Sequence, residues 1–182
     1  MLLAACEDLS LPGVEVPTSS LIVLPLSSNA PAPAGLSFYV SNAHATTRNL
    51  IHSDGFNTVF ATVSFPAGSL ASLDGVTLNA GDSVQVTLTA DPAIYGLHLA
   101  PDGLGFASQA VPFLTFSYAR YGDLTTAAGS QYPDPAAYAA ALAVWHAGSL
   151  GLWSKVGSAG SVGTDVGATL SQGGHYQVAA LR

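Results

Sequence analysis

Apolar and polar side chains alternate with a period of two in several short segments, and this pattern limits the fold more than any other feature. In the clearest case, the segment 83–90, Val84, Val86, Leu88 and Ala90 alternate with Ser83, Gln85, Thr87 and Thr89. Successive side chains of a β-strand point to opposite faces of the sheet. The segment therefore predicts a half-buried strand with one dry face and one Thr-rich wet face.

The same pattern recurs along the chain. Leu36, Phe38 and Val40 share one face of a second predicted strand, and a third is predicted from Val59, Ala61, Val63 and Phe65. Further strands are expected at 94–99, 111–118, 142–146, 150–156, 165–170 and 175–181. Turn sequences such as Asp54-Gly55 and Asp74-Gly75 separate them. Many short strands at this spacing predict an all-β, antiparallel β-sandwich. We expect at most one short helix, at 135–141, capped by Asp134.

The charge content excludes several classes of partner. Only 8% of the residues are charged, and 11 acids against 4 Lys and Arg give a net charge of −7. Binding to a phosphate backbone requires clustered cations, so we expect no nucleic-acid partner. No window holds the ~18 consecutive apolar residues that a membrane-spanning helix needs. The hydrophobic content of 49% is also too high for a chain that does not collapse.

The single cysteine, Cys6, suggests a lipid anchor. The sequence Leu3-Ala4-Ala5-Cys6 resembles a bacterial lipobox, in which the cysteine thiol is acylated and the chain is cut before it. Residues 1–6 would then be the remnant of a lipoprotein signal. A signal peptide also needs a cationic start and an apolar run of roughly 7–15 residues, and only Met1 to Ala5 precede Cys6. We therefore expect Met1 to be a clipped or misannotated start. The alternative is an incidental or buried cysteine near an apolar start.

Residues 7–35 are rich in Pro and Ser and predict an extended tether in front of a domain at 36–182. Within the tether, the segment Leu21, Ile22, Val23, Leu24, Pro25 and Leu26 is apolar and β-prone. Pro25 confines such a segment to a sheet edge or a strand end. It is either an edge strand of the domain itself or a strand that adds to the open sheet edge of a neighbouring copy.

A resemblance to a known family arises in the middle of the chain. The sequence Phe65-Pro66-Ala67-Gly68-Ser69-Leu70 is followed by the segment 95–106 and then by the predicted strand at 111–118. These three segments, in this order along the chain, resemble the ZU-five domain of ankyrins, netrin receptors and zonula occludens proteins. Pro101, Gly103 and Phe106 match that family's Pro-x-Gly-x-x-Phe turn, whereas Val111-Pro112 reverses its usual Pro-Val order. In such a turn Pro101 fixes the backbone, Gly103 allows a positive φ and Phe106 returns into the core.

The resemblance covers about residues 59–118, with a weaker likeness toward the C-terminus. Trp145, Trp153 and the segment 174–176 resemble the closing strands of secreted bacterial proteins that carry this domain. Such proteins are often lipoproteins, which implies a location in the cell envelope and agrees with Cys6. Some animal members cleave themselves at a His-Phe-Ser site. The corresponding His175-Tyr176-Gln177 has no hydroxyl or thiol nucleophile, so self-cleavage by that route is not expected.

No sequence motif for catalysis or for a cofactor is found, and we expect neither. A Gly-x-Ser-x-Gly nucleophile elbow and a phosphate-binding loop are both absent from the sequence. His44, His52 and Asp54 offer two nitrogens and a carboxylate, but their spacing fits no compact zinc motif, so solvated or capping histidines are expected. His146 and His175 are expected to be satisfied interior or rim histidines. The aspartates belong to turns, and a calcium site would require that several of them converge in space.

These observations predict a non-enzymatic lipoprotein of the cell envelope, or a secreted one, that acts as a scaffold or binding module. Its expected partners are a membrane, through the lipid anchor, and a protein or a second copy of the chain. The alternative is a self-assembling structural subunit of an extracellular filament or surface layer, joined through strand addition by 21–26. Exposed aromatic patches are expected at 118–121 and 132–138, where Tyr residues favour interfaces or sugar stacking.

Overall fold

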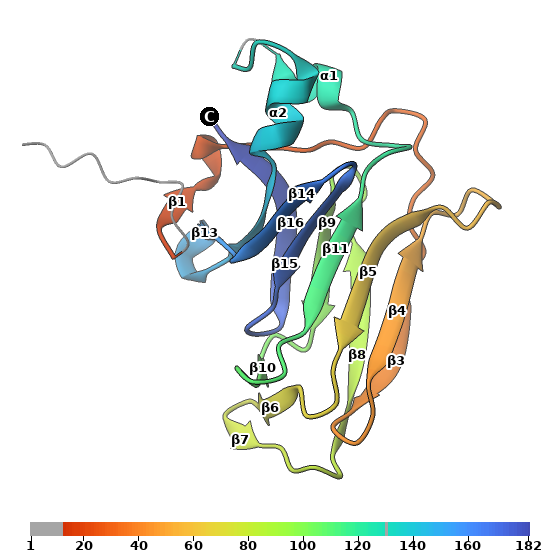
Figure 1. Ribbon diagram of the computed structural model, residues 1–182, viewed down its shortest axis with the longest axis vertical. Helices are drawn as coiled ribbons and strands as arrows, with labels where there is room; N and C mark the ends of the chain where they lie inside the picture. The colour runs from red at the N-terminus through yellow and green to blue at the C-terminus, as the bar shows by residue number, and fades with distance from the viewer. Residues whose placement is uncertain (1–12, 130) are drawn as a thin grey trace, which may run out of the picture.

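The computed structural model describes residues 13–129 and 131–182. Its strands form an eight-stranded, a five-stranded and a three-stranded antiparallel sheet. The two larger sheets lie face to face, with the five-stranded sheet in front in Figure 1. The predicted all-β, antiparallel β-sandwich is therefore confirmed.

The larger layer of the sandwich is the eight-stranded sheet. Its strands are β1 (Glu15–Pro17), β2 (Leu21–Val23), β3 (Leu36–Ser41), β8 (Ser83–Ala90), β9 (Gly96–Ala100), β12 (Ala143–Ala147), β13 (Leu152–Lys155) and β16 (Gly174–Leu181). They are arranged in the order β1-β13-β12-β16-β9-β8-β3, and β2 also pairs with β16. Strand β16 is long enough to pair with β9 near its start and with β2 near its end.

The smaller layer has the order β14-β15-β11-β5-β4. Its strands are β14 (Ser158–Val162), β15 (Asp165–Thr169), β11 (Phe113–Ser117), β5 (Val59–Phe65) and β4 (Thr46–Ile51). A three-stranded sheet of β10 (Leu104–Phe106), β6 (Leu70–Leu73) and β7 (Val76–Thr77) lies at the lower end in Figure 1. Strand β4 was not predicted, because its residues Thr46 to Asn49 include no apolar side chain.

Two short α-helices lie at the opposite end of the sandwich from the three-stranded sheet (Figure 1). They are α1 (Leu124–Ala128) and α2 (Pro135–Ala141), and single 3-10 turns occur at η1 (Thr18–Ser20) and η2 (Ser149–Gly151). Helix α2 begins where predicted, with the Asp134 carboxylate accepting a hydrogen bond from the Ala137 amide at 2.8 Å. The expectation of at most one helix was wrong, because five residues are too few to show a helical period in α1. No helix in the described ranges is both long and apolar enough to cross a membrane.

The main core lies between the two large sheets. Along β8, Val84, Val86 and Leu88 are buried as the alternation predicts. Strand β5 departs from the alternation at a shift of its register with β4. Ala61 pairs with Leu50, and Val59 pairs with Ile51. Phe60, which lies between Ala61 and Val59, therefore has no partner in β4. A β-bulge of this kind changes the direction in which a side chain points. Phe60 is consequently buried together with Ala61, which strict alternation would place on the opposite face.

The described part of the predicted tether, residues 13–35, is largely part of the folded domain, and residues 7–12 lie outside the described residues. Strand β1 pairs with β13, and β2 pairs with the end of β16 in the same chain. Val16 and Leu21 are buried in a second apolar cluster on the outer face of the eight-stranded sheet, together with Trp145 and Trp153. The Trp153 indole donates a hydrogen bond to the Thr18 hydroxyl at 3.0 Å.

Residues 21–23 of the apolar segment 21–26 form the strand β2 of its own domain in this structure, and Pro25 and Leu26 make single β-bridges to Ile94 and Gly122. An edge strand of the domain itself was one of the two interpretations of this segment. Side chains alternate between two cores, since Leu21 and Val23 belong to the outer cluster whereas Ile22 and Leu24 contact the main core. Leu24 is fully buried, and its carbonyl accepts a hydrogen bond from the Tyr95 amide at 2.9 Å. Composition alone suggested a tether because proline and serine surround this short apolar run.

Candidate functional site

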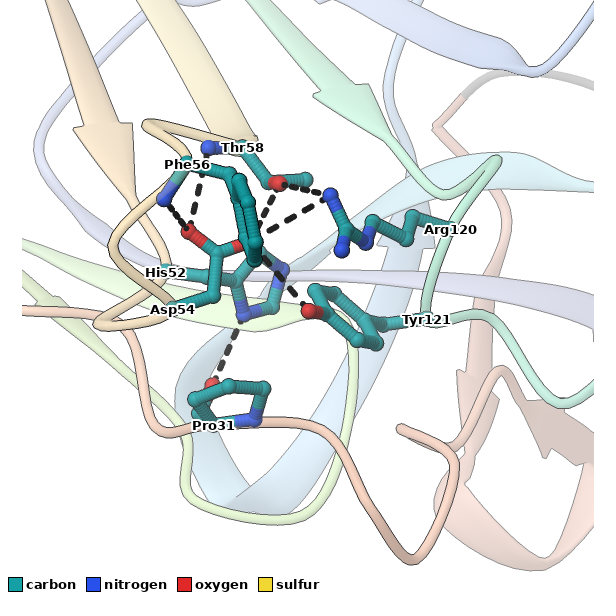
Figure 2. Close-up of polar contacts among 7 residues, drawn as sticks. All are labelled: Pro31, His52, Asp54, Phe56, Thr58, Arg120 and Tyr121. Carbon is teal, nitrogen blue, oxygen red and sulfur yellow. Dashed lines mark hydrogen bonds and ion pairs between the residues drawn. The ribbon is translucent and has the colours of Figure 1, made fainter.

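Two loops from neighbouring strands meet at the helical end of the sandwich (Figure 2). The first, residues 52–58, joins β4 to β5, and the second, residues 118–123, joins β11 to α1. Because β5 and β11 are adjacent in the five-stranded sheet, both loops start from one rigid base. The predicted turn at Asp54-Gly55 is confirmed, with Gly55 at a φ of 73°, a conformation that glycine adopts without steric cost.

The Asp54 carboxylate holds the two loops together, and its side chain is only 3% exposed. Within its own loop it accepts hydrogen bonds from the Phe56 amide at 2.8 Å, from the Thr58 amide at 3.4 Å and from the Thr58 hydroxyl. From the second loop the Tyr121 hydroxyl donates at 3.2 Å, and the Arg120 guanidinium lies 3.8 Å away. Figure 2 shows all of these groups converging on the carboxylate.

This environment favours the ionised carboxylate and so lowers the pKa of Asp54 to about 2. The hydroxyl of Thr58 is the main cause, and the two loop amides and the Tyr121 hydroxyl add to it, against the effect of burial. Burial in turn raises the pKa of Tyr121, as does its hydrogen bond to Asp54. A carboxylate with so low a pKa and so many donors is a poor general base near neutral pH. Asp54 therefore organises the loops and is not suited to proton transfer.

The outer surface of the cluster presents an aromatic ring and a cation. The Phe56 side chain is 73% exposed, and the Arg120 guanidinium carbon lies 4.8 Å from the centre of its ring. The same guanidinium lies 5.4 Å from the ring centre of Tyr121 and donates a hydrogen bond to the Thr58 hydroxyl at 3.2 Å. Arg120 is thus held over Phe56 by groups in both loops.

His52 lies beneath this surface and not in solvent, which corrects the expectation for this histidine. It is 1% exposed, its Nδ1 lies 2.8 Å from the Pro31 carbonyl oxygen, and its ring contacts Phe60 and Tyr121. His44 is exposed in the turn after β3. Across residues 13–129 and 131–182, no group of three or more His, Cys, Asp or Glu side chains is arranged to hold a metal ion. His44, His52 and Asp54 do not form such a group in this part of the chain.

We expect replacement of Asp54 by Asn to remove part of the pH dependence of stability. A carboxylate whose pKa is lowered by folding stabilises the protein above its unfolded pKa of 3.8, and this contribution disappears as the pH falls through about 2. The difference in the free energy of unfolding between wild type and Asp54→Asn should be constant above about pH 5 and shrink toward about pH 2. Urea unfolding at a series of pH values measures it, and a gap independent of pH would contradict the assignment.

The family-like turn was predicted in the right place but for a partly wrong reason. Gly103 does not have a positive φ. A Cβ at this position would lie 1.9 Å from an Asp74 carboxylate oxygen, which can rotate away, and 3.2 Å from the Asp74 backbone nitrogen, so the fit against the 73–75 turn is tight and the reason for glycine is not its φ. Pro101 closes the turn by accepting a hydrogen bond from the Leu104 amide at 3.1 Å. Phe106 is half-buried against the main core and lies 5.8 Å from Phe65, measured between ring centres.

Of the remaining predicted site residues, one lies outside the described residues and the aromatic ones are more buried than predicted. Cys6 lies outside the described residues. The aromatic patches expected at 118–121 and 132–138 are not exposed, because Tyr118, Tyr121 and Tyr138 are buried and Tyr132 is half-buried. Sequence reasoning missed Phe56, although the Asp-Gly turn next to it did indicate an exposed loop, and it pointed to the segment 118–121 for its tyrosines and not for Arg120. Comparison with protein-family models, with curated proteins and with solved structures finds no match to this chain.

Proposed function

We propose that the protein is a non-enzymatic binding module of a cell-envelope or secreted lipoprotein and that Phe56 and Arg120 contact a protein partner. The observation that carries this proposal is the exposed Phe56 ring with Arg120 fixed above it. Aromatic residues and Arg are enriched at protein interfaces and supply much of the binding energy there. Because Asp54 holds the Phe56 backbone amide, and Thr58 and Tyr121 contact the Arg120 guanidinium, we expect binding to cost less conformational entropy than it would on a flexible loop.

The charge of the surface indicates the chemistry of the partner. Arg120 is one of only four Lys and Arg residues in a chain of net charge −7. A complementary surface would offer an apolar pocket for Phe56 and a carboxylate for Arg120. The proposed location in the envelope rests on the lipobox-like sequence at 3–6 and on the ZU-five-like turn at 101–106, and both remain predictions.

Cross-linking in cells tests the proposal. A photoreactive phenylalanine at position 56 of the full-length protein should give a discrete cross-linked species, and the change Arg120→Gln should reduce its yield. The matched control is the same probe at position 76, because Val76 is also exposed, at 68%, but lies in the three-stranded sheet at the other end. Equal cross-linking at both positions, or none at position 56, would contradict the proposed contact. Mass spectrometry of the native N-terminus tests the anchor, with a diacylglyceryl group expected on Cys6.

The alternative function, a self-assembling subunit, requires β2 to pair with a neighbouring copy. In this structure β2 pairs with β16 of its own chain, and Leu24 fills the main core. A second copy would have to displace this strand before it could add there. The pairing within the chain therefore favours the binding module.

A further inference from the structure

A groove opens between the two large sheets, on the side where β12 faces β15. Its volume is about 440 Å³, and small-molecule sites commonly have volumes of about 300–1,000 Å³. The eight-stranded sheet contributes His146, Ser154 and Tyr176 to its lining, and the opposite side contributes Phe106 of β10 and Leu170 at the end of β15. The groove is therefore built from both layers of the sandwich and is large enough for a small molecule.

The walls of this groove are mainly apolar. Phe106, Val156, Leu170 and Tyr176 line it, and all four belong to the main core or pack against it. Val111, in the loop that joins β10 to β11, lines it as well. Covering apolar surface with an apolar body is favourable because it removes that surface from water. The groove therefore favours a ligand whose bulk is apolar.

His146 is the one histidine in the described lining of the groove, and it is uncharged near pH 7. Along β12, Val144 belongs to the main core and Trp145 to the outer cluster, so alternation directs His146 to the inner side. Its ring there lies 4.7 Å from the ring of Tyr176, measured between centres. Burial lowers the pKa of His146, and its Nε2 lies 3.4 Å from the Gly173 carbonyl oxygen. His146 therefore adds a polar group to the groove but no charge.

Among the described residues, no charged side chain is directed into the groove. Lys155 lines it, but it lies opposite Trp145 in the register, and the Trp145 side chain belongs to the outer cluster. Residues directly opposite in paired strands point to the same face, so the Lys155 side chain points to the outer face. The other described lining residues include no Asp, Glu, Lys or Arg. An anion finds no ion pair here, in a chain of net charge −7, and a cation finds no carboxylate.

We propose that this groove binds an uncharged, mainly apolar small molecule, held between the two layers by Phe106, Leu170 and Tyr176. The two aromatic rings offer a large contact area to such a ligand. An ion of either sign would lose water without gaining a charged partner, whereas an uncharged molecule avoids this cost. The inference goes beyond the proposed protein contact, because no described residue of the loops 52–58 and 118–123 lines the groove.

Fluorescence titration of the full-length protein with N-phenyl-1-naphthylamine tests the proposal. This probe is uncharged, consists mainly of apolar rings and brightens in apolar surroundings. We expect saturable binding of one molecule per chain, with a Kd on the order of 100 μM for a ligand of this size. The matched anionic probe, 1-anilinonaphthalene-8-sulfonate, has the same rings and an added sulfonate. It should bind at least about 10-fold more weakly, because its charge would enter the groove unpaired.

Two variants fill the groove from different elements. Ser154→Phe adds a ring from β13, where Ser154 lies opposite His146, and Val111→Phe adds one from the loop before β11. Each should weaken binding of the uncharged probe by at least about 10-fold. The matched control is Ser37→Phe, the same change at an exposed position of β3 that should leave the Kd unchanged. Circular dichroism and thermal unfolding establish that each variant is folded.

Three outcomes would overturn the proposal. The first is the absence of saturable binding to the wild-type protein, whether the groove is too open to hold a ligand or is filled by another part of the chain. The second is equal affinity for the two probes, which would contradict an uncharged ligand. The third is binding that survives both Ser154→Phe and Val111→Phe, because the probe would then bind elsewhere. Cross-linking at position 56 does not depend on any of these results, so the two proposals fail separately.

Discussion

Replacing Phe60 by Ala should lower the free energy of unfolding by about 3–5 kcal/mol, the range for large aromatic residues truncated in a core. Phe60 is fully buried and touches aromatic rings from three other segments. Its ring stacks on Tyr95 at 5.1 Å, meets Phe116 edge-on at 5.7 Å and lies 5.5 Å from His52. Alanine would leave a cavity where these segments meet, and the surrounding side chains would relax only in part.

Thermal and urea unfolding measure this effect. For a chain of this size, a loss of 3–5 kcal/mol corresponds to a decrease in Tm of about 6–20 °C. Two controls bracket the result. Phe60→Leu keeps most of the volume and should cost less than the alanine variant, and Val76→Ser, at an exposed position, should stay within about 0.5 kcal/mol of wild type. A loss below about 1 kcal/mol for Phe60→Ala would contradict the central position of this ring.

Deleting residues 7–34 should abolish cooperative folding. The deletion removes β1, β2 and the buried side chains of Val16, Leu21 and Leu24. At about 1.5–3 kcal/mol for each buried aliphatic side chain, their loss alone approaches the 5–15 kcal/mol that stabilises a typical domain. It would also uncover Trp145 and Trp153, which these strands cover on the outer face of the sheet.

Near-UV circular dichroism and light scattering report the outcome of this deletion. We expect the tryptophan signal to be lost and the product to aggregate, whereas the full-length chain should be a folded monomer. The point variant Leu24→Ala is a milder companion and should cost about 2–5 kcal/mol while still folding. A deletion product that is monomeric, cooperatively folded and as stable as wild type would show that residues 13–34 are a tether after all. A full-length protein that forms dimers or filaments would instead favour exchange of β2 between copies.

The elements that the sequence predicted well are those whose signal is local. The alternation in β8 and the turn at Asp74-Gly75 depend on neighbouring residues only, and both are confirmed by the structure. Helix α2 was predicted from its own cap and first-turn proline. Strand β4 gave no such signal, because three consecutive residues, Thr47 to Asn49, are exposed at the edge of the five-stranded sheet. An edge strand with little to bury carries little hydrophobic pattern.

The candidate sites could be predicted only in part, because each combines residues that are far apart in the chain. The turn at Asp54 was predicted, but Arg120 and Tyr121 reach it only because β5 and β11 are neighbours in the sheet. The groove beside His146 likewise combines Phe106, Leu170 and Tyr176, which come from different strands and from both layers. Neither the strand order nor the register is encoded in the residues next to these side chains.

The sequence by itself determined the class of fold, the positions of most strands and the Asp-Gly turns, since these follow from the period of side chains along one strand. The tertiary structure decided that Phe60 turns into the core at a bulge, that residues 14–26 cover two tryptophans, and that Asp54 ties two loops together. The physical reason is the range of the interactions involved. Alternation and turn geometry act over a few residues, whereas burial, strand register and hydrogen bonds between loops depend on which distant segments share a surface.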